Sequence, residues 1–301
     1  MSRPLRSLAA LAAVGALALA GCASGSDDPA ASEELGTEDR PVKIGVVGKS
    51  EAYWGAFEEA AEAEDIHIEL VDFTEYTQPN PALAAGELDI NKFQHILYLA
   101  DHNEAAGDDL QPIGATEIYP LGLYSDKYDS PEDIPDGETV IVPNDTTNQA
   151  RGLLVLQSAG LISLDGGGTA FSTLEDIVEE DSRVSVEALD ASLVGTSLPD
   201  VAAAIINNDF LDNAGLTGED AIAQDDPSDP DAVPYINIFA VKADDVDNEV
   251  LNKLVEIYQT DEKTLELVQE SAGGTAVFAT NPAEELQEVL ADVQADIQSA
   301  G

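Results

Sequence analysis

Strand-like and helix-like segments alternate along the chain from residue 42 onward. The β-rich run VKIGVVG (42–48) precedes a helical stretch, EAYWGAFEEAAEAE (51–64), and a second extended run, IHIELVDF (66–73). The segment NPALAAGE (80–87) predicts a short helix with Asn80 as its N-cap and a proline at its first position. Strands that alternate with helices are typical of α/β layers around a mainly parallel sheet. The sequence therefore predicts an α/β fold.

A second unit of the same kind begins after YPLGLYS (119–125). The strand-like run ETVIVP (138–143) leads into a helical segment, NDTTNQARGLLVLQSAG (144–160), and the C-terminal part of the chain is helical with one apolar stripe. Two α/β lobes, with the C-terminal helices returning to the first lobe, are the simplest assembly of these segments. The predicted boundaries are 41–120 plus 239–301 for lobe 1 and 121–238 for lobe 2.

The N-terminal segment MSRPLRSLAALAAVGALALAGC has the features of an export signal. Two arginines precede an apolar run from Leu8 to Ala20, which is too short and too rich in alanine for a comfortable membrane span. The tetrad LAGC (19–22) resembles the bacterial lipobox, in which the cysteine is lipidated and becomes the first residue of the mature protein. We therefore predict a signal peptide over residues 1–21, lipid attachment at Cys22 and a flexible tether over residues 22–40.

The composition excludes several classes of partner and chemistry. With 12 Lys+Arg against 60 Asp+Glu, the net charge of -48 argues against nucleic acid and against docking on anionic lipid by charge alone. Cys22 is the only cysteine, so no disulfide framework and no thiolate for catalysis are expected. Three scattered histidines give no zinc signature, and there is no phosphate-binding loop and no G-x-S-x-G elbow. We predict no metal, no cofactor and no catalytic residue.

Polar residues at the ends of predicted strands are the candidates for binding. Arg151 lies in the first two turns of its helix, where the helix dipole disfavours a cation, and Asn148 shares that helix. Asn207 follows the apolar run VAAAII, and Asn237 interrupts the strand YINIF. Ligands in open α/β sheets bind outside the carboxyl ends of the strands, where an arginine binds a carboxylate and asparagines accept from an ammonium group. Each residue alone also fits a turn, a cap or a surface ion pair.

Aromatic residues form the second group of candidates. Tyr76, Phe93, His95 and Tyr98 lie in neighbouring predicted elements. Core packing is the ordinary interpretation of Phe93 and Tyr98, whereas a histidine among them is less easily explained as core.

Two long segments resemble a known family. VDFTEYTQPNPALAAGELDINKFQHILYL (71–99) is similar to the diagnostic segment of the methionine-binding lipoproteins (the MetQ/NlpA family), which are substrate-binding components of ABC importers. VPNDTTNQARGLLVLQSAGLISL (142–164) is similar to the second signature of that family. The shorter segments IYPLGLYS, AIINNDF and PYINIFAV follow in the same order, and the resemblance covers residues 42–301.

The resemblance implies a two-lobed periplasmic-binding-protein-like fold of type II, with the ligand cleft between lobes that close on one free amino acid. It implies chain crossings near 119–125 and 234–240, and it implies that Arg151 binds the ligand carboxylate. The remaining implied ligand-binding residues are Asn148, Asn207 and Asn237 for the polar groups and Tyr76, Phe93, His95 and Tyr98 around the thioether chain. Trp54, in the first βα connection, departs from the family pattern; it either reshapes the side-chain pocket or packs under the first helix.

The sequence thus predicts a lipid-anchored, monomeric, extracytoplasmic protein that binds L-methionine and delivers it to an ABC permease and its ATPase. For a transport protein of this kind, four alternative ligands stay open: D-methionine, methionine sulfoxide, a methionyl dipeptide and another apolar amino acid. A surface enzyme and an adhesion or scaffold protein are the alternatives from other classes.

Overall fold

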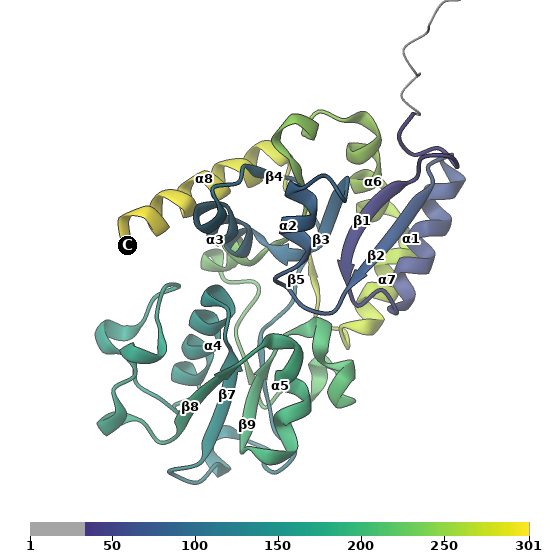
Figure 1. Ribbon diagram of the computed structural model, residues 1–301. Coiled ribbons are helices and arrows are strands. Elements are labelled where there is room, and N and C mark those ends of the chain that lie inside the picture. The colour runs from purple at the N-terminus through teal and green to yellow at the C-terminus, as the bar shows by residue number, and fades with distance from the viewer. Residues whose placement is uncertain (1–33, 301) are drawn as a thin grey trace, which may run out of the picture. The chain divides into compact units, whose positions relative to one another are not determined.

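A computed structural model describes residues 34–300 (Figure 1). The predicted signal peptide, Cys22 and the tether up to residue 33 lie outside the described residues. Within the described part of the chain, no helix is long and apolar enough to cross a membrane.

The first sheet has five strands in the order β2-β1-β3-β11-β4. Strand β1 runs parallel to its neighbours β2 and β3, whereas β11 runs antiparallel to both β3 and β4. A strand from late in the chain therefore lies inside a sheet built mainly from its first third. The strands are β1 (Val42–Val47), β2 (Ile68–Phe73), β3 (Ile90–His95), β4 (Leu110–Ala115) and β11 (Asn237–Lys242).

Helices pack on both faces of this sheet. One apolar cluster joins Val42 and Ile44 to the helices α1 (Ala52–Ala63), α6 (Glu249–Thr260) and α7 (Glu262–Ser271). A second cluster joins the other face to α2 (Pro79–Ala84), α3 (Ile96–Ala106) and α8 (Ala283–Ala300). Because side chains alternate along a strand, Phe239 of β11 packs in the first cluster and Ile238 in the second. Trp54 is 1% exposed and belongs to the first cluster, which corresponds to packing under the first helix.

The second sheet has five strands in the order β10-β6-β9-β7-β8. Strand β7 runs parallel to β8 and β9, and β6 runs antiparallel to β9 and β10. Leu153 and Leu156 of α4 (Thr146–Ser158) pack on one face, and α5 (Ala191–Ser197) packs on the other. The strands are β6 (Gly122–Tyr124), β7 (Thr139–Pro143), β8 (Ser185–Leu189), β9 (Ala203–Ile206) and β10 (Ala223–Gln224).

The chain passes between the sheets twice. It leaves the first lobe after β5 (Glu117–Ile118), which pairs with β12 (Val277–Phe278), and enters the second sheet at β6. It returns through the 3-10 segment η9 (Pro230–Tyr235) to β11. Strand β11 begins at Asn237, two residues before the predicted boundary at residue 239, because Asn237 already pairs with His95.

Residues 34–40 are part of the first lobe rather than of the predicted tether. Leu35 packs against the first apolar cluster. The backbone closes a turn in which the N–H of Gly36 donates to the carbonyl of Arg40 over 2.8 Å, and the N–H of His67 donates to the carbonyl of Gly36 over 2.8 Å. These bonds fix the segment beside the start of β2, so the prediction of a tether up to Arg40 is wrong for these seven residues.

Candidate functional site

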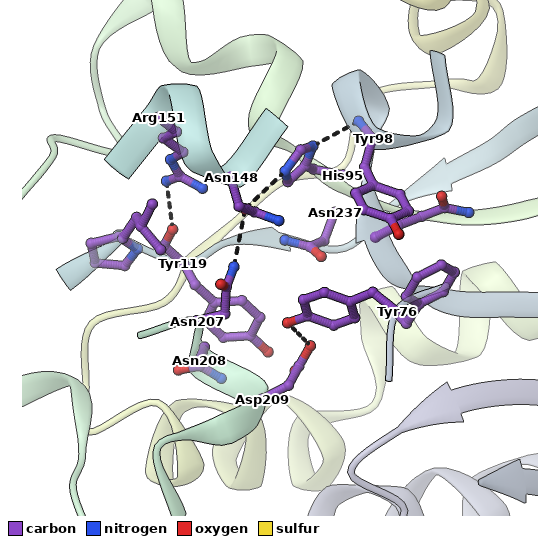
Figure 2. Close-up of a pocket in the computed structure, with 14 residues that line it drawn as sticks. Tyr76, His95, Tyr98, Tyr119, Asn148, Arg151, Asn207, Asn208, Asp209 and Asn237 are labelled. Atoms are coloured by element: carbon purple, nitrogen blue, oxygen red, sulfur yellow. Dashed lines mark hydrogen bonds between the residues drawn. The ribbon is translucent and has the colours of Figure 1, made fainter. Parts of the chain in front are cut away.

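A cavity lies where the carboxyl ends of strands β3 and β9 approach each other (Figure 2). It brings together all eight residues predicted to bind a ligand. The lining residues are Tyr76, Phe93, Gln94, His95, Tyr98, Tyr119, Pro120, Leu121, Asn148, Arg151, Asn207, Asn208, Asp209 and Asn237.

The topology explains this convergence. His95 is the last residue of β3, and Asn207 directly follows β9, so both lie at carboxyl ends of strands, where ligands of α/β sheets bind. Asn148 and Arg151 lie on α4, which follows the carboxyl end of β7. Strand β11 runs antiparallel to β3, so its first residue, Asn237, is the register partner of His95.

Arg151 is 5% exposed, and its side chain is held by contacts with three other residues. Its Nε and Nη2 donate to the two carboxylate oxygens of Asp225 over 2.5 and 3.2 Å, and Nη2 also donates to the carbonyl of Tyr119 over 2.9 Å. The centroid of the Tyr235 ring lies 4.3 Å from the Cζ atom of Arg151. Among residues 34–300, the remaining nitrogen, Nη1, makes no hydrogen bond. Arg151 is therefore part of the cavity wall and at the same time one half of an ion pair, whose other half, Asp225, is not among the lining residues.

Two asparagine amides continue that wall. The Oδ1 of Asn148 accepts from the Nδ2 of Asn207 over 3.0 Å, and its own amide nitrogen donates to Asp145, the N-cap of α4, over 3.0 Å. The Oδ1 of Asn207 is buried and has no hydrogen-bond partner among the described residues. An unpaired buried acceptor is costly, so this oxygen is suited to a donor that enters the cavity.

His95 is held as a neutral imidazole. Its Nδ1 accepts from the backbone N–H of Tyr98 over 3.0 Å, which caps α3 and leaves the proton on Nε2. Nε2 lies 3.4 Å from the Oδ1 of Asn148, across the two lobes. Burial lowers the pKa of His95 to about 3, and the nearby charge of Arg151 acts in the same direction. The imidazole therefore carries no charge at any physiological pH.

Three aromatic rings form the apolar side of the cavity. The ring centroids of Tyr76, Phe93 and Tyr98 lie 5.8 to 6.1 Å from one another. The hydroxyl of Tyr76 donates to the Oδ2 of Asp209, in the second lobe, over 2.8 Å (Figure 2). Burial raises the pKa of Tyr76 and of Tyr98, so both hydroxyls stay neutral.

A buried ion pair supports the cavity from behind. The Nζ of Lys92 lies 2.6 Å from the Oε1 of Glu117, and the two side chains are 4% and 0% exposed. The hydroxyl of Tyr258 donates to the other carboxylate oxygen of Glu117 over 3.1 Å. The ammonium group of Lys92 also lies 5.6 to 5.9 Å from the centroids of the rings of Tyr53, Trp54, Tyr119 and Tyr258. Such aromatic faces stabilise a cation that is withdrawn from water.

Several residues in or beside the cavity were not predicted from the sequence. Asp209 lies only two positions after Asn207, but its carboxylate gave no signal in so acidic a chain. Tyr119, Pro120 and Leu121 belong to a segment that was assigned only to the chain crossing. Asp225, the partner of Arg151, belongs to the acidic loop AQDDPSDPDAVP, in which nothing distinguishes it from its neighbours.

Comparison with known proteins identifies the family. Residues 42–280 match the NlpA lipoprotein family. The chain belongs to this family. A probable D-methionine-binding lipoprotein MetQ of Pasteurella multocida (strain Pm70) is 38% identical over 266 residues, which is 87% of this chain and 94% of that protein. The D-methionine-binding lipoprotein MetQ of Escherichia coli (strain K12) is 35% identical over 268 residues, with 87% and 94% coverage.

Solved structures with 33–36% sequence identity to this chain have the same fold. A nutrient-binding protein from Burkholderia cenocepacia, solved bound to methionine, aligns with a TM-score of 0.73 at 36% identity over 79% of this chain and 99% of that one. Protein PG110 from Staphylococcus aureus aligns with a TM-score of 0.79 at 33% identity over 84% and 99% of the two chains. The predicted family and the predicted two-lobed α/β fold of the periplasmic-binding-protein type are thus confirmed.

Proposed function

We propose that this NlpA family member is a lipid-anchored, extracytoplasmic, monomeric binding protein that captures L-methionine and delivers it to an ABC permease and its ATPase. The observation that carries the proposal is one cavity with two unlike sides. A guanidinium group and an unpaired amide oxygen lie on one side, and three aromatic rings with a neutral imidazole lie on the other. A single amino acid with an apolar, polarizable side chain matches both sides.

The ligand's polar groups have distinct partners in this proposal. The carboxylate binds Nη1 of Arg151, because Nε and Nη2 are engaged with Asp225 and Tyr119. The ammonium group donates to the free Oδ1 of Asn207, and Asn237 contributes its amide beside His95. A charge-assisted hydrogen bond of this kind contributes about 1.5–3 kcal/mol.

The thioether chain lies among Tyr76, Phe93 and Tyr98, where sulfur–aromatic contacts contribute about 0.3–1.5 kcal/mol. The imidazole ring of His95 lines the same cavity, and its Nε2 lies 3.4 Å from the Oδ1 of Asn148. D-Methionine is the second candidate, since relatives at 35–38% identity carry that ligand in their names.

Binding takes place by closure of the two lobes, and no catalytic step is proposed. Tyr76 and His95 come from the first lobe, whereas their partners Asp209 and Asn148 come from the second. A ligand that contacts both lobes stabilises the closed arrangement over an open one by its differential affinity. The anchor is the lipid on Cys22.

A thermal-shift screen tests the function. The purified protein is melted with each of the twenty amino acids, their D-forms, methionine sulfoxide and methionyl dipeptides. At a ligand concentration of about a thousand times Kd, binding adds about 4 kcal/mol, which raises Tm by on the order of 10 °C for a protein of this size. Methionine should give the largest rise. No rise with any of these compounds at millimolar concentration would reject the proposal.

Asn207→Ala provides a matched test of the site. Loss of the unpaired acceptor should weaken methionine about 10- to 100-fold in calorimetry. Asn213→Ala removes an exposed amide from the same lobe and should leave Kd unchanged. Equal Kd values for the two variants would remove Asn207 from the site.

A further inference from the structure

A carboxylate faces the cavity from the second lobe. Asp209 lies in the short 3-10 segment η6 (Asn208–Phe210), directly after β9, and lines the cavity. Its Oδ2 accepts from the hydroxyl of Tyr76 over 2.8 Å, and Figure 2 shows the carboxylate directed at that hydroxyl. Tyr76 is neutral, so this hydrogen bond orients the carboxylate without compensating its charge.

The two cations beside the cavity already have partners. Arg151 is paired with Asp225, and Lys92 is paired with Glu117. Among residues 34–300, no cation lies within ion-pair distance of Asp209. The two ion pairs carry no net charge, and Asp209 is the only acidic residue among those that line the cavity, so its carboxylate is the unpaired charge of the lining before a ligand enters. Charge–charge interactions are strong in such a setting, because the surrounding protein screens them less than water does.

This balance sets a requirement on the ligand. A carboxylate that binds Arg151 adds a second uncompensated negative charge to the cavity, unless the same ligand also brings a positive one. A zwitterion brings its own ammonium group and adds no net charge. A 2-hydroxy acid or 2-oxo acid with the same side chain adds a full negative charge near Asp209.

We propose that Asp209 is a specificity-determining residue that makes an ammonium group on the ligand obligatory, so that the site admits α-amino acids and rejects the corresponding 2-hydroxy and 2-oxo acids. The inference rests on the proposed function, because it concerns the selectivity of that same cavity. Asn207 supplies a neutral acceptor, which a hydroxyl group also satisfies. Asp209 supplies the charge that a hydroxyl group cannot compensate.

The groups that face Asp209 define its ionisation. They are Tyr76, Tyr53 and Glu51 of the first lobe, the Lys92–Glu117 pair behind the cavity and Asp212 on the same loop. Burial raises the pKa of Asp209 to about 6, partly offset by Lys92 and by the bond from Tyr76. Asp209 is therefore a carboxylate at pH 8 and largely a neutral acid at pH 5, so the selectivity should be greater at pH 8.

Calorimetry with two ligands tests the assignment. L-Methionine and 2-hydroxy-4-(methylthio)butanoate, which replaces the ammonium group by a hydroxyl, are titrated into the wild type and into Asp209→Asn at pH 8. The affinity ratio in favour of methionine should fall about ten-fold or more in the variant, mainly because the hydroxy acid binds better. Asp200→Asn removes an exposed carboxylate from the same lobe and should keep the wild-type ratio.

The outcomes separate this inference from the proposed function. If the wild type does not bind methionine, the proposed function fails. If the wild type binds methionine and Asp209→Asn keeps the wild-type ratio, the role of Asp209 is overturned. As a second measurement that needs no variant, the wild-type ratio should shrink between pH 8 and pH 5; a constant ratio also overturns the inference. Both comparisons use ratios within one protein, so effects of pH or substitution on lobe closure cancel.

Discussion

Replacing Glu51 by Gln removes one of several carboxylates that approach each other from opposite lobes at the rim of the cleft. Glu51 immediately precedes α1 in the first lobe, and Asp209 and Asp212 belong to the second; all three line one depression. Burial raises the pKa of Glu51 to about 7, and the charge of Asp212, a hydrogen bond to Asp212 and the charge of Asp209 act in the same direction. The arrangement of the lobes in the structure therefore favours the protonated form of Glu51, and separation of the lobes would lower its pKa.

The difference between the pKa values of Glu51 with the lobes together and apart sets the direction and the size of its effect on closure. A pKa that is higher in the closed state favours closure fully below the ordinary value of 4.5, and this contribution is lost as pH rises through about 7. The full shift would correspond to about 3.4 kcal/mol. Glu51 is only partly buried, and some of its burial persists in the open state, so solvent screening reduces the figure to about 1 kcal/mol, or about five-fold in Kd.

The assay is calorimetric titration of methionine between pH 5.5 and 8. Because Asp209 protonates in the same range, the measured quantity is the ratio of the Kd of the wild type to that of Glu51→Gln. This ratio should rise about five-fold from pH 5.5 to pH 8, since Gln keeps a neutral hydrogen-bonding group at every pH. His95 stays neutral throughout and does not contribute. Glu58→Gln, on the exposed side of α1, is the control and should show a pH-independent ratio. A pH-independent ratio for Glu51→Gln as well would refute the reasoning.

Three further predictions concern the buried groups. Arg151→Ala should weaken methionine more than 100-fold in calorimetry and lower the free energy of unfolding in urea by about 1–3 kcal/mol, because Asp225 and the Tyr119 carbonyl lose their donor. His95→Ala should weaken methionine more than norleucine, which lacks sulfur, in the same assay. Lys92→Met should lower the free energy of unfolding by about 3–5 kcal/mol, because it leaves Glu117 as an uncompensated buried charge.

Each of these three predictions has a control or an outcome that would contradict it. Arg183→Ala, which removes the partly exposed arginine of the second lobe paired with Asp136, is the control for Arg151 and should leave Kd unchanged. Retained affinity in Arg151→Ala would place the ligand carboxylate elsewhere. Equal losses for methionine and norleucine would reject a contact between His95 and sulfur. For Lys92, adding Glu117→Gln should recover part of the lost stability, and no recovery would contradict the charge argument.

Local patterns sufficed for most of the fold, and long-range pairing accounts for the rest. The alternation of strands and helices follows from hydrophobic periodicity within short windows of sequence. This alternation predicts parallel strands, and each of the two five-stranded sheets contains three neighbouring strands that run parallel. The insertion of β11 between β3 and β4 depends on partners more than a hundred residues away, which no local pattern contains. Asn80 was predicted to cap α2, but α2 begins at Pro79. Its amide instead bonds Gln94 and Asn91, because it is buried against β3.

The candidate site was predictable to a similar degree. The eight predicted residues reach one cavity because each lies near a strand end or a helix start, positions that the sequence marks. Asp225 could not be identified, since it lies 74 residues from Arg151 in a loop with several equivalent aspartates. In a chain with 60 acidic residues, the identity of a buried carboxylate depends on packing and not on composition.

The contacts of Arg151 explain why an arginine lies in the second turn of a helix, where the dipole opposes it. Both of its protein partners belong to segments next to the chain crossings: Tyr119 directly follows β5, and Asp225 directly follows β10. The Oδ1 of Asp225 also accepts from the backbone N–H of Leu121 over 2.8 Å. The guanidinium group of Arg151, on α4, is therefore bonded directly and through Asp225 to the segment 119–121, which links the lobes. A carboxylate bound at Nη1 would be held against that link, so that one residue couples recognition of the ligand to the relative position of the two lobes.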